Sequence, residues 1–166
     1  MPASEQGVTH DRYTLIPRTL IFLTREDRVL LIKGAPHKRL WANRYNGIGG
    51  HIERGEDVLS AAQRELREET GLSSPDLRLC GTVTIDTGQH IGVGLFVLTG
   101  TCLEGVPVQS PEGVSEWVPV SGLGSLLLVE DLHTLLPRVL AVQPNDPPFA
   151  AHYRYDDEDR LVITFG

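Results

Sequence analysis

Apolar residues recur at helical spacing between residues 57 and 69, and this pattern predicts an amphipathic helix. The apolar stripe consists of Val58, Leu59, Ala62 and Leu66. Asp57 stands where an N-cap or first-turn anion is expected, and Gly71 is a typical left-handed residue just beyond the last turn. A second helical pattern covers residues 130–142, in which Pro137 is expected to kink or end the helix.

Apolar and β-branched runs on both sides of the first helix predict strands. They cover residues 13–23, 28–33, 76–85, 90–103, 116–120, 149–155 and 161–165. Pro17 predicts a bulge or break in the first strand, and a turn at residues 24–27 joins the first two strands into a hairpin. The periodicity therefore predicts one α/β or α+β domain over residues 11–166, preceded by a flexible segment at residues 1–10.

Composition narrows the class of protein. Hydrophobic residues make up 40% of the 166 positions and charged residues 22%, which is ordinary for a soluble globular domain. The net charge of -7 argues against a general nucleic-acid binder, which usually carries a basic surface. Cys80 and Cys102 lack metal-ligand spacing and are expected to be buried free thiols. Without a signal peptide or an apolar run of membrane-spanning length, we expect a cytoplasmic protein with no membrane partner.

Three carboxylates occupy one face of the first predicted helix. Glu65, Glu68 and Glu69 are spaced at i, i+3 and i+4, so like charges repel by a few tenths of a kcal/mol per pair. A hard divalent cation with oxygen ligands would offset this repulsion, whereas a solvated Glu/Arg-rich surface helix is the ordinary alternative. Gly49 and Gly50 precede the helix and allow close backbone approach to a ligand, which favours the metal site.

The spacing of these residues resembles the box motif of the Nudix hydrolases. The motif reads Gly50-x5-Glu56-x7-Arg64-Glu65-Leu66-x-Glu68-Glu69-x-Gly71-Leu72, and every fixed position is filled. The resemblance implies an α/β/α sandwich around a central mixed β-sheet, with residues 45–50 forming an extended strand that leads into the catalytic loop. It also implies Mg²⁺-dependent hydrolysis of a phosphoanhydride bond, with Mn²⁺ as the alternative metal.

The resemblance assigns metal ligands residue by residue. Glu65 and Glu69 are the first metal ligands, and Glu68 joins them as a ligand and a catalytic residue. The carbonyl oxygen of Gly49 is a further ligand in similar enzymes. These oxygen ligands suit Mg²⁺, which neutralises phosphate charge and lowers the pKa of a bound water.

The resemblance also assigns the residues that support catalysis. Arg64 is expected to orient a catalytic glutamate by ion pairing, and Glu56 to support the loop and the helix start. An additional acid often comes from a later loop in this family. Glu112 is the candidate for that ligand or general base, and Glu116 is its competitor.

The segment before the box suggests the substrate. Residues 44–50 resemble the corresponding segment of the oxidised purine nucleotide diphosphatases, which cleave 8-oxo-dGTP to the monophosphate and pyrophosphate. That resemblance implies that Asn46 contacts the base and that Glu130 and Asp131 bind the purine edge, although the acidic pair would also suit a helix cap. Residues 127–128 are leucines where those enzymes carry a stacking tryptophan.

Basic and aromatic residues near this segment add three expectations. Lys33 is expected to bind substrate, and the basic loop at residues 34–39 either faces phosphates or is merely solvated. Leu40 and Trp41 are expected to pack beneath the glycine turn.

Three functions therefore remain open on the sequence. The first is a nucleoside triphosphate pyrophosphohydrolase, and the second is a hydrolase of nucleoside-diphosphate conjugates such as ADP-ribose. Pro75 lies closer to the box than the proline of the ADP-ribose enzymes, which disfavours the second. The third is a nucleotide sensor without turnover, which would usually lose box carboxylates. All three imply a small-molecule nucleotide partner, and a monomer or homodimer.

Overall fold

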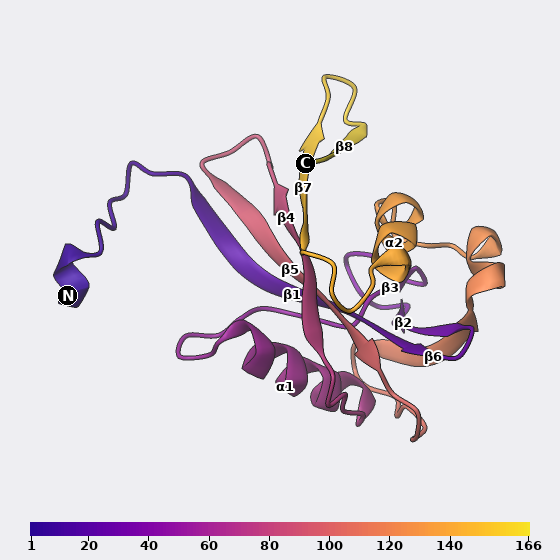
Figure 1. The fold of residues 1–166 in the computed structure, drawn as a ribbon. Helices are drawn as coiled ribbons and strands as arrows, with labels where there is room; N and C mark the ends of the chain where they lie inside the picture. Colours follow the sequence, from indigo (N-terminus) through magenta and orange to yellow (C-terminus); the bar gives the residue numbers. More distant parts are fainter.

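One mixed, curved β-sheet forms the centre of the computed structural model, which describes all 166 residues (Figure 1). Its strands are β1 (Thr14–Arg25), β2 (Arg28–Gly34), β3 (Tyr45–Asn46), β4 (Arg78–Ile85), β5 (Ile91–Thr101), β6 (Gly113–Pro119), β7 (Phe149–Tyr155) and β8 (Leu161–Phe165). The strand order is β3-β2-β1-β5-β4-β7-β8, and β6 pairs with β2. The predicted hairpin β1–β2 is present, and β7 and β8 also form an antiparallel pair.

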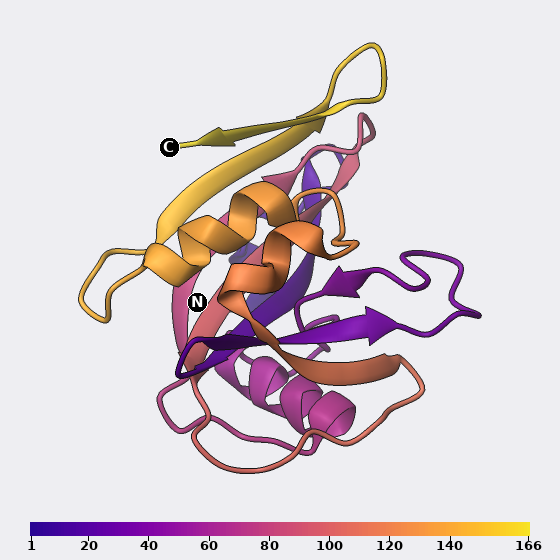
Figure 2. The same cartoon turned by 90° about the vertical axis from the view of Figure 1, so that its right-hand side faces the viewer.

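Two helices cover opposite faces of the sheet, as the sandwich architecture requires (Figure 2). Helix α1 (Val58–Thr70) packs against one apolar cluster that includes Ile21 and Leu98, and α2 (Leu132–Ala141) packs against the other. Neither helix combines the length and hydropathy that a membrane crossing requires. The fold is therefore the expected α/β sandwich with a mixed sheet.

The central pair of strands is parallel and long. Strand β1 pairs with β5 from Thr14↔Ile91 to Thr24↔Thr101, without the predicted break at Pro17. The carbonyl oxygen of Pro17 accepts from the Ile52 amide at 3.1 Å, so its ring nitrogen also faces away from β5. Because this nitrogen faces away from β5, the missing N–H removes no hydrogen bond from the β1–β5 ladder.

Pro137 is also accommodated, because it lies inside α2 without ending it. An internal proline costs a helix about 3 kcal/mol. The buried apolar side chains of α2 are Leu132, Leu135, Leu136 and Val139. Each such side chain contributes roughly 1.5–3 kcal/mol on burial, so packing of this face outweighs the proline.

Two short 3₁₀ turns lie outside the predicted elements. Residues 3–5 form η1 within the segment expected to be flexible, and all of them are exposed. This segment extends away from the body of the molecule (Figure 1). The second turn, η2 (Val120–Ser125), lies just before the connection to α2. Cys80 and Cys102 are buried and free, as expected.

Candidate active site

The loop before α1 is held against β1 by backbone hydrogen bonds. The Thr19 amide donates to the Gly50 carbonyl at 2.8 Å. A Cβ at Gly49 would overlap the Thr19 carbonyl oxygen, and one at Gly50 would lie 2.5 Å from Oε1 of Glu65. Strand β3 ends at Asn46, and only isolated bridges at Ile48 and His51 continue the predicted extended segment. Glycine thus allows the loop backbone to lie directly against β1 at Gly49 and against the Glu65 carboxylate at Gly50.

Both predicted caps of α1 are formed by the residues expected. Oδ1 of Asp57 accepts from the Ser60 amide at 2.9 Å, and Gly71 ends the helix with a φ of 72°. These local interactions fix where α1 begins and ends. They also fix the direction in which its glutamates project.

Arg64 connects the loop to the helix. Its Nε and Nη2 donate to the two carboxylate oxygens of Glu56 at 2.6 and 2.9 Å, and Nη2 also donates to the His51 carbonyl. Its Nη1 donates to Glu65 at 2.7 Å and to Glu68 at 3.3 Å. Hydrogen bonds from Arg64 and from the Glu53 amide lower the pKa of Glu56 to about 2. Arg64 and Glu56 therefore act as a brace, and neither lines the cavity beside them.

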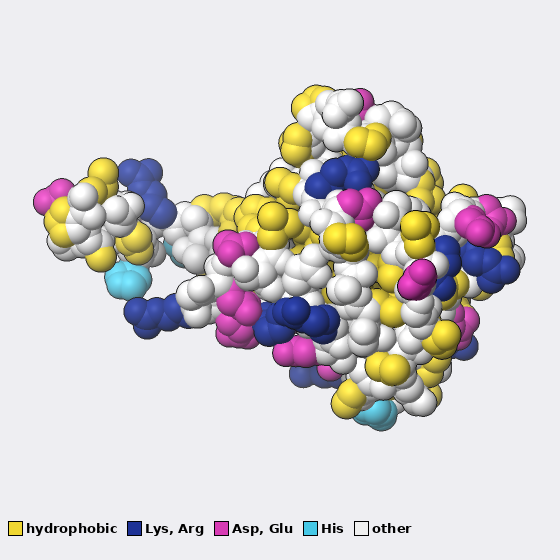
Figure 3. Space-filling model, turned by 60° about the horizontal axis from the view of Figure 1, so that its bottom comes forward, with side chains coloured by type: hydrophobic (Ala, Val, Ile, Leu, Met, Phe, Trp, Pro, Cys, Tyr) yellow, Lys and Arg dark blue, Asp and Glu magenta, His cyan; other side chains and the backbone are white.

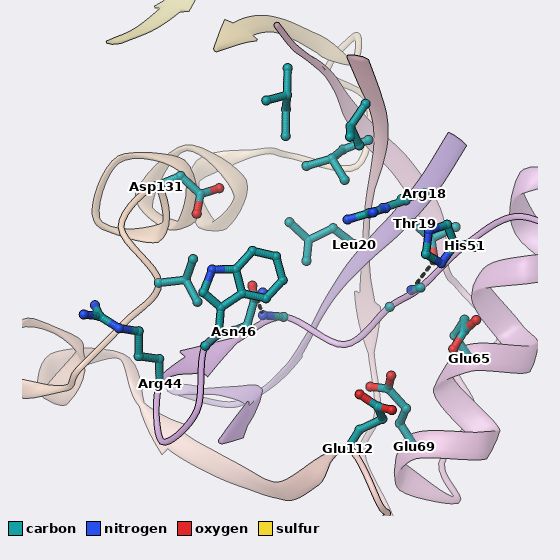
Figure 4. A pocket seen from close by; sticks show the side chains of 18 of the residues that line it. Arg18, Thr19, Leu20, Arg44, Asn46, His51, Glu65, Glu69, Glu112 and Asp131 are labelled. Carbon is teal, nitrogen blue, oxygen red and sulfur yellow. Dashed lines mark hydrogen bonds between the residues drawn. The ribbon is translucent and has the colours of Figure 1, made fainter. Parts of the chain in front are cut away.

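Acidic side chains from two elements meet at one end of a cavity of about 810 Å³. Glu65 and Glu69 project from α1, and Glu112 projects from the β5–β6 connection to face Glu69 (Figure 4). Glu69 is only 7% exposed, and burial, followed by the charges of Glu65 and Glu112, raises its pKa to about 8. Glu68 is 61% exposed at the rim. Lys38 forms an ion pair with Glu112.

This donor set fits a hard divalent cation in its chemistry. Carboxylate oxygens are the ligands that Mg²⁺ prefers, and a bound cation would offset the repulsion that raises the Glu69 pKa. No three acidic, histidine or cysteine side chains converge as a preformed metal cluster. The protein thus supplies oxygen donors along one wall, which suits Mg²⁺ because that ion usually retains water and shares substrate phosphates.

The other end of the cavity carries the predicted base-binding residues. Asn46 lines it, and its Oδ1 accepts from the Gly47 amide at 2.8 Å. Glu130 and Asp131 line the wall at the start of α2, where burial raises the pKa of Asp131. Asp131 makes no side-chain capping hydrogen bond, which removes the capping alternative for that residue. Tyr153 is buried in this region, and burial, followed by the nearby Asp131 carboxylate, raises the pKa of its hydroxyl.

Three charged residues near the site differ in whether they line the cavity. Lys33 lies outside the cavity, and its ammonium stands 5.7 Å from the centre of the Tyr45 ring. Its role in binding substrate stays a prediction. Glu116 also lies outside the cavity and accepts from the Tyr45 hydroxyl at 3.2 Å, which leaves Glu112 as the acid that reaches the site. From the basic loop, Lys38 lines the cavity.

Trp41 is the functional candidate that the sequence reasoning missed. Leu40 and Trp41 do not pack beneath the glycine turn, since they are 61% and 46% exposed, and Trp41 lines the cavity. Its φ of 59° is unusual for a bulky residue. The Trp41 carbonyl accepts from the Arg44 amide, and Gly34 leaves room for that carbonyl because a Cβ there would lie 2.5 Å away. The long-range contact with Gly34 is invisible in the local sequence pattern.

Comparison with solved structures identifies the fold class. The structure of the mutator MutT protein from Bacillus halodurans is 25% identical, covers 91% of this chain and 97% of its own, and superimposes with a TM-score of 0.76. The chain thus has the fold of MutT-like proteins.

Comparison of the sequence then identifies the family. The model of the NUDIX domain matches residues 14–155, so the chain belongs to the Nudix family and is a Nudix hydrolase. Two relatives are named oxidized purine nucleoside triphosphate hydrolase. The mouse protein is 28% identical and the Danio rerio protein 31%, each across 87% of this chain and 89% of the relative.

Proposed function

We propose that this hydrolase cleaves a purine nucleoside triphosphate, including oxidised forms such as 8-oxo-dGTP, to the monophosphate and pyrophosphate with the aid of Mg²⁺. One observation carries the proposal. A single cavity joins the acidic wall of Glu65, Glu69 and Glu112 to a compartment lined by Asn46 and Asp131. The acidic wall suits metal-bound phosphates and the second compartment suits a hydrogen-bonding base. The activity in the names of the mouse and Danio rerio relatives agrees with this arrangement.

In the proposed mechanism, the chain's own residues position the metal ligands and deprotonate the attacking water. Mg²⁺, when held by Glu65, Glu69 and the Gly49 carbonyl, supplies charge neutralisation and lowers the pKa of water. Arg64 keeps Glu65 in place through its hydrogen bond at 2.7 Å. Glu112 faces the site from a loop and accepts the proton from the attacking water. Glu68, at the rim, contributes a further carboxylate oxygen.

At the other end, the chain orients the base. Asn46 and the carboxylates of Glu130 and Asp131 supply hydrogen-bonding groups for its edge. Trp41 supplies the aromatic surface that residues 127–128 lack, since its indole is half-exposed at the cavity. Base stacking on an aromatic side chain contributes on the order of 1–3 kcal/mol in single-stranded nucleic-acid complexes.

The proposed partner is a free nucleotide of the cytoplasmic pool, with residues 11–166 as the catalytic domain. Basic and acidic side chains are interspersed on the face shown in Figure 3, and that face has no broad basic surface of the kind that nucleic-acid binding uses. The net charge of -7 supports the same conclusion.

A product assay tests the proposed function. We would incubate the protein with Mg²⁺ and 8-oxo-dGTP, each common dNTP, ADP-ribose or a nucleotide sugar, and resolve the products by chromatography. We expect a nucleoside monophosphate and pyrophosphate from a purine triphosphate. Turnover of ADP-ribose or sugar conjugates alone would assign the second function, and tight binding without any turnover would assign the sensor. Glu65→Gln is the matched inactive control, because it keeps the shape of the side chain and removes its charge.

A further inference from the structure

Arg18 is a cation in the cavity whose hydrogen-bonding capacity is unused. Its side chain lines the cavity, and Nε is shielded from solvent without any hydrogen-bond partner. No acidic group lies within salt-bridge distance of its guanidinium, although seven carboxylate residues line the same cavity. A buried donor without a partner costs free energy, which indicates that a ligand supplies the missing hydrogen-bond acceptor.

The other permanent cations of the cavity are already engaged. Lys38 forms an ion pair with Glu112, and Arg44 donates to the Leu128 carbonyl at 3.3 Å. Arg18 thus differs from both, since its Nε has no hydrogen-bond partner and its guanidinium forms no ion pair within the protein. Arg18 does not neutralise the acidic wall either, because it forms no ion pair with Glu65, Glu69 or Glu112.

The backbone of Arg18 is fixed on both sides. It pairs with Leu95 of β5 in the parallel ladder and with His51 through an antiparallel bridge. Residues two apart in a strand share a face, so its side chain lies with Leu20, which belongs to the apolar cluster on the α2 side. In Figure 4, Arg18 points toward the side of the cavity that carries Asp131, and away from Glu65, Glu69 and Glu112.

We propose that Arg18 recognises a carbonyl oxygen of the nucleobase and thereby helps to select the base. This inference rests on the proposed function. The phosphates belong beside the acidic wall, from which Arg18 points away, so the group that it meets lies on the base or sugar side. Asp131 presents acceptors across the cavity, whereas Arg18 presents only donors. A ring with N–H groups on one edge and a carbonyl on another matches both walls.

The discriminating experiment uses four triphosphates that differ in their carbonyl groups. dATP has none, dGTP has one at C6, 8-oxo-dATP has one at C8, and 8-oxo-dGTP has both. We would measure kcat/KM for each with wild type, Arg18→Gln and Arg18→Lys. For Arg18→Gln we expect a loss of roughly 10- to 100-fold confined to bases that carry the recognised carbonyl, with dATP unchanged. Arg18→Lys keeps a cationic donor but lacks the planar, two-pronged guanidinium, so its kcat/KM for these bases should fall less than that of Arg18→Gln.

A binding measurement gives a readout that does not depend on turnover. In buffer with a chelator, calorimetry would compare the affinities of 8-oxo-dGMP, dGMP, dAMP and ribose 5-phosphate for the same variants. Arg154→Gln is the matched control, because Arg154 is an exposed strand arginine that does not line the cavity. The proposal is supported if Arg18→Gln loses affinity for the carbonyl-bearing nucleotides alone and Arg154→Gln does not.

Two results would overturn the inference while leaving the proposed function intact. An equal loss for all four triphosphates, with weaker ribose 5-phosphate binding, would assign Arg18 to phosphate instead. Unchanged kinetics and affinities would remove it from recognition altogether. If wild type cleaved none of the triphosphates, the proposed function would fail, and the monophosphate affinities would still decide the role of Arg18. Misfolding would lower the dATP rate as well, and it would not be relieved in Arg18→Lys, so these two measurements distinguish it from lost recognition.

Discussion

The acidic wall makes a quantitative prediction for Glu69→Gln in the metal-free protein. Glu69 is 7% exposed, and its pKa rises from 4.5 to about 8. Because this folded-state pKa lies above that of the unfolded chain, the protein is fully stable with respect to this group below pH 4.5 and loses stability as the pH rises toward 8. At 1.36 kcal/mol per pKa unit, the loss reaches roughly 5 kcal/mol as a ceiling.

Glutamine keeps the shape of the side chain and cannot ionise, so the variant should escape this loss. Side-chain rotation and water penetration reduce the ceiling, and we expect the variant to be about 2–5 kcal/mol more stable than wild type above pH 8. Near pH 4.5 the two proteins should have similar stability. Added Mg²⁺ should stabilise wild type at high pH, by binding the native state, and leave the variant unchanged.

Urea unfolding monitored by circular dichroism, in buffer with a chelator and at a series of pH values, measures this difference. Free energies of unfolding of wild type and Glu69→Gln that run parallel between about pH 5 and pH 9 would contradict this prediction. The activity of the same variant, measured with Mg²⁺, tests whether Glu69 also serves catalysis. Turnover should be abolished in the variant although its fold is more stable, which a purely structural glutamate would not produce.

Three further outcomes follow from contacts at the site. Gly50→Ala places a Cβ 2.5 Å from Oε1 of Glu65, so kcat should fall at least about 10-fold at nearly unchanged melting temperature. Arg64→Lys removes the two-pronged contact with Glu56 and should lower kcat while KM changes little, measured by steady-state kinetics. Trp41→Ala should raise KM by roughly 5- to 100-fold for purine triphosphates, whereas Trp41→Phe should stay near wild type. A KM for Trp41→Ala equal to that of wild type would exclude stacking.

Elements held by local interactions were predictable from the sequence. Helix α1 depends on its own apolar stripe and on caps at Asp57 and Gly71, and each of these signals lies within a few residues of the helix. The glutamate spacing on α1 likewise predicted that Glu65 and Glu69 would share a face. The effect of Pro17 depends instead on which side of β1 its nitrogen faces, and only the pairing with β5 reveals that.

The base end of the cavity shows where sequence reasoning stops. The side chain of Lys33 was expected in the site, but Lys33 pairs with Tyr45 in register and its ammonium lies over the ring of that partner. Trp41 reaches the cavity through a left-handed backbone position that depends on Gly34. Arg18 carries no motif, and its importance follows only from being unpaired in a cavity built from distant segments.

The parallel pairing of β1 with β5 also has a consequence for how the chain folds during synthesis. Leu20 pairs with Val97, a partner that is synthesised only after β1 and the whole of α1. Bringing together strands that are so far apart in the sequence is slow, so until β5 arrives one edge of β1 has unpaired backbone N–H and C=O groups. A nascent chain that ends before Ile91 would expose that edge and be prone to aggregate. The loop at Gly49 and Gly50 docks on this same strand, so the catalytic end of the molecule becomes ordered late in synthesis.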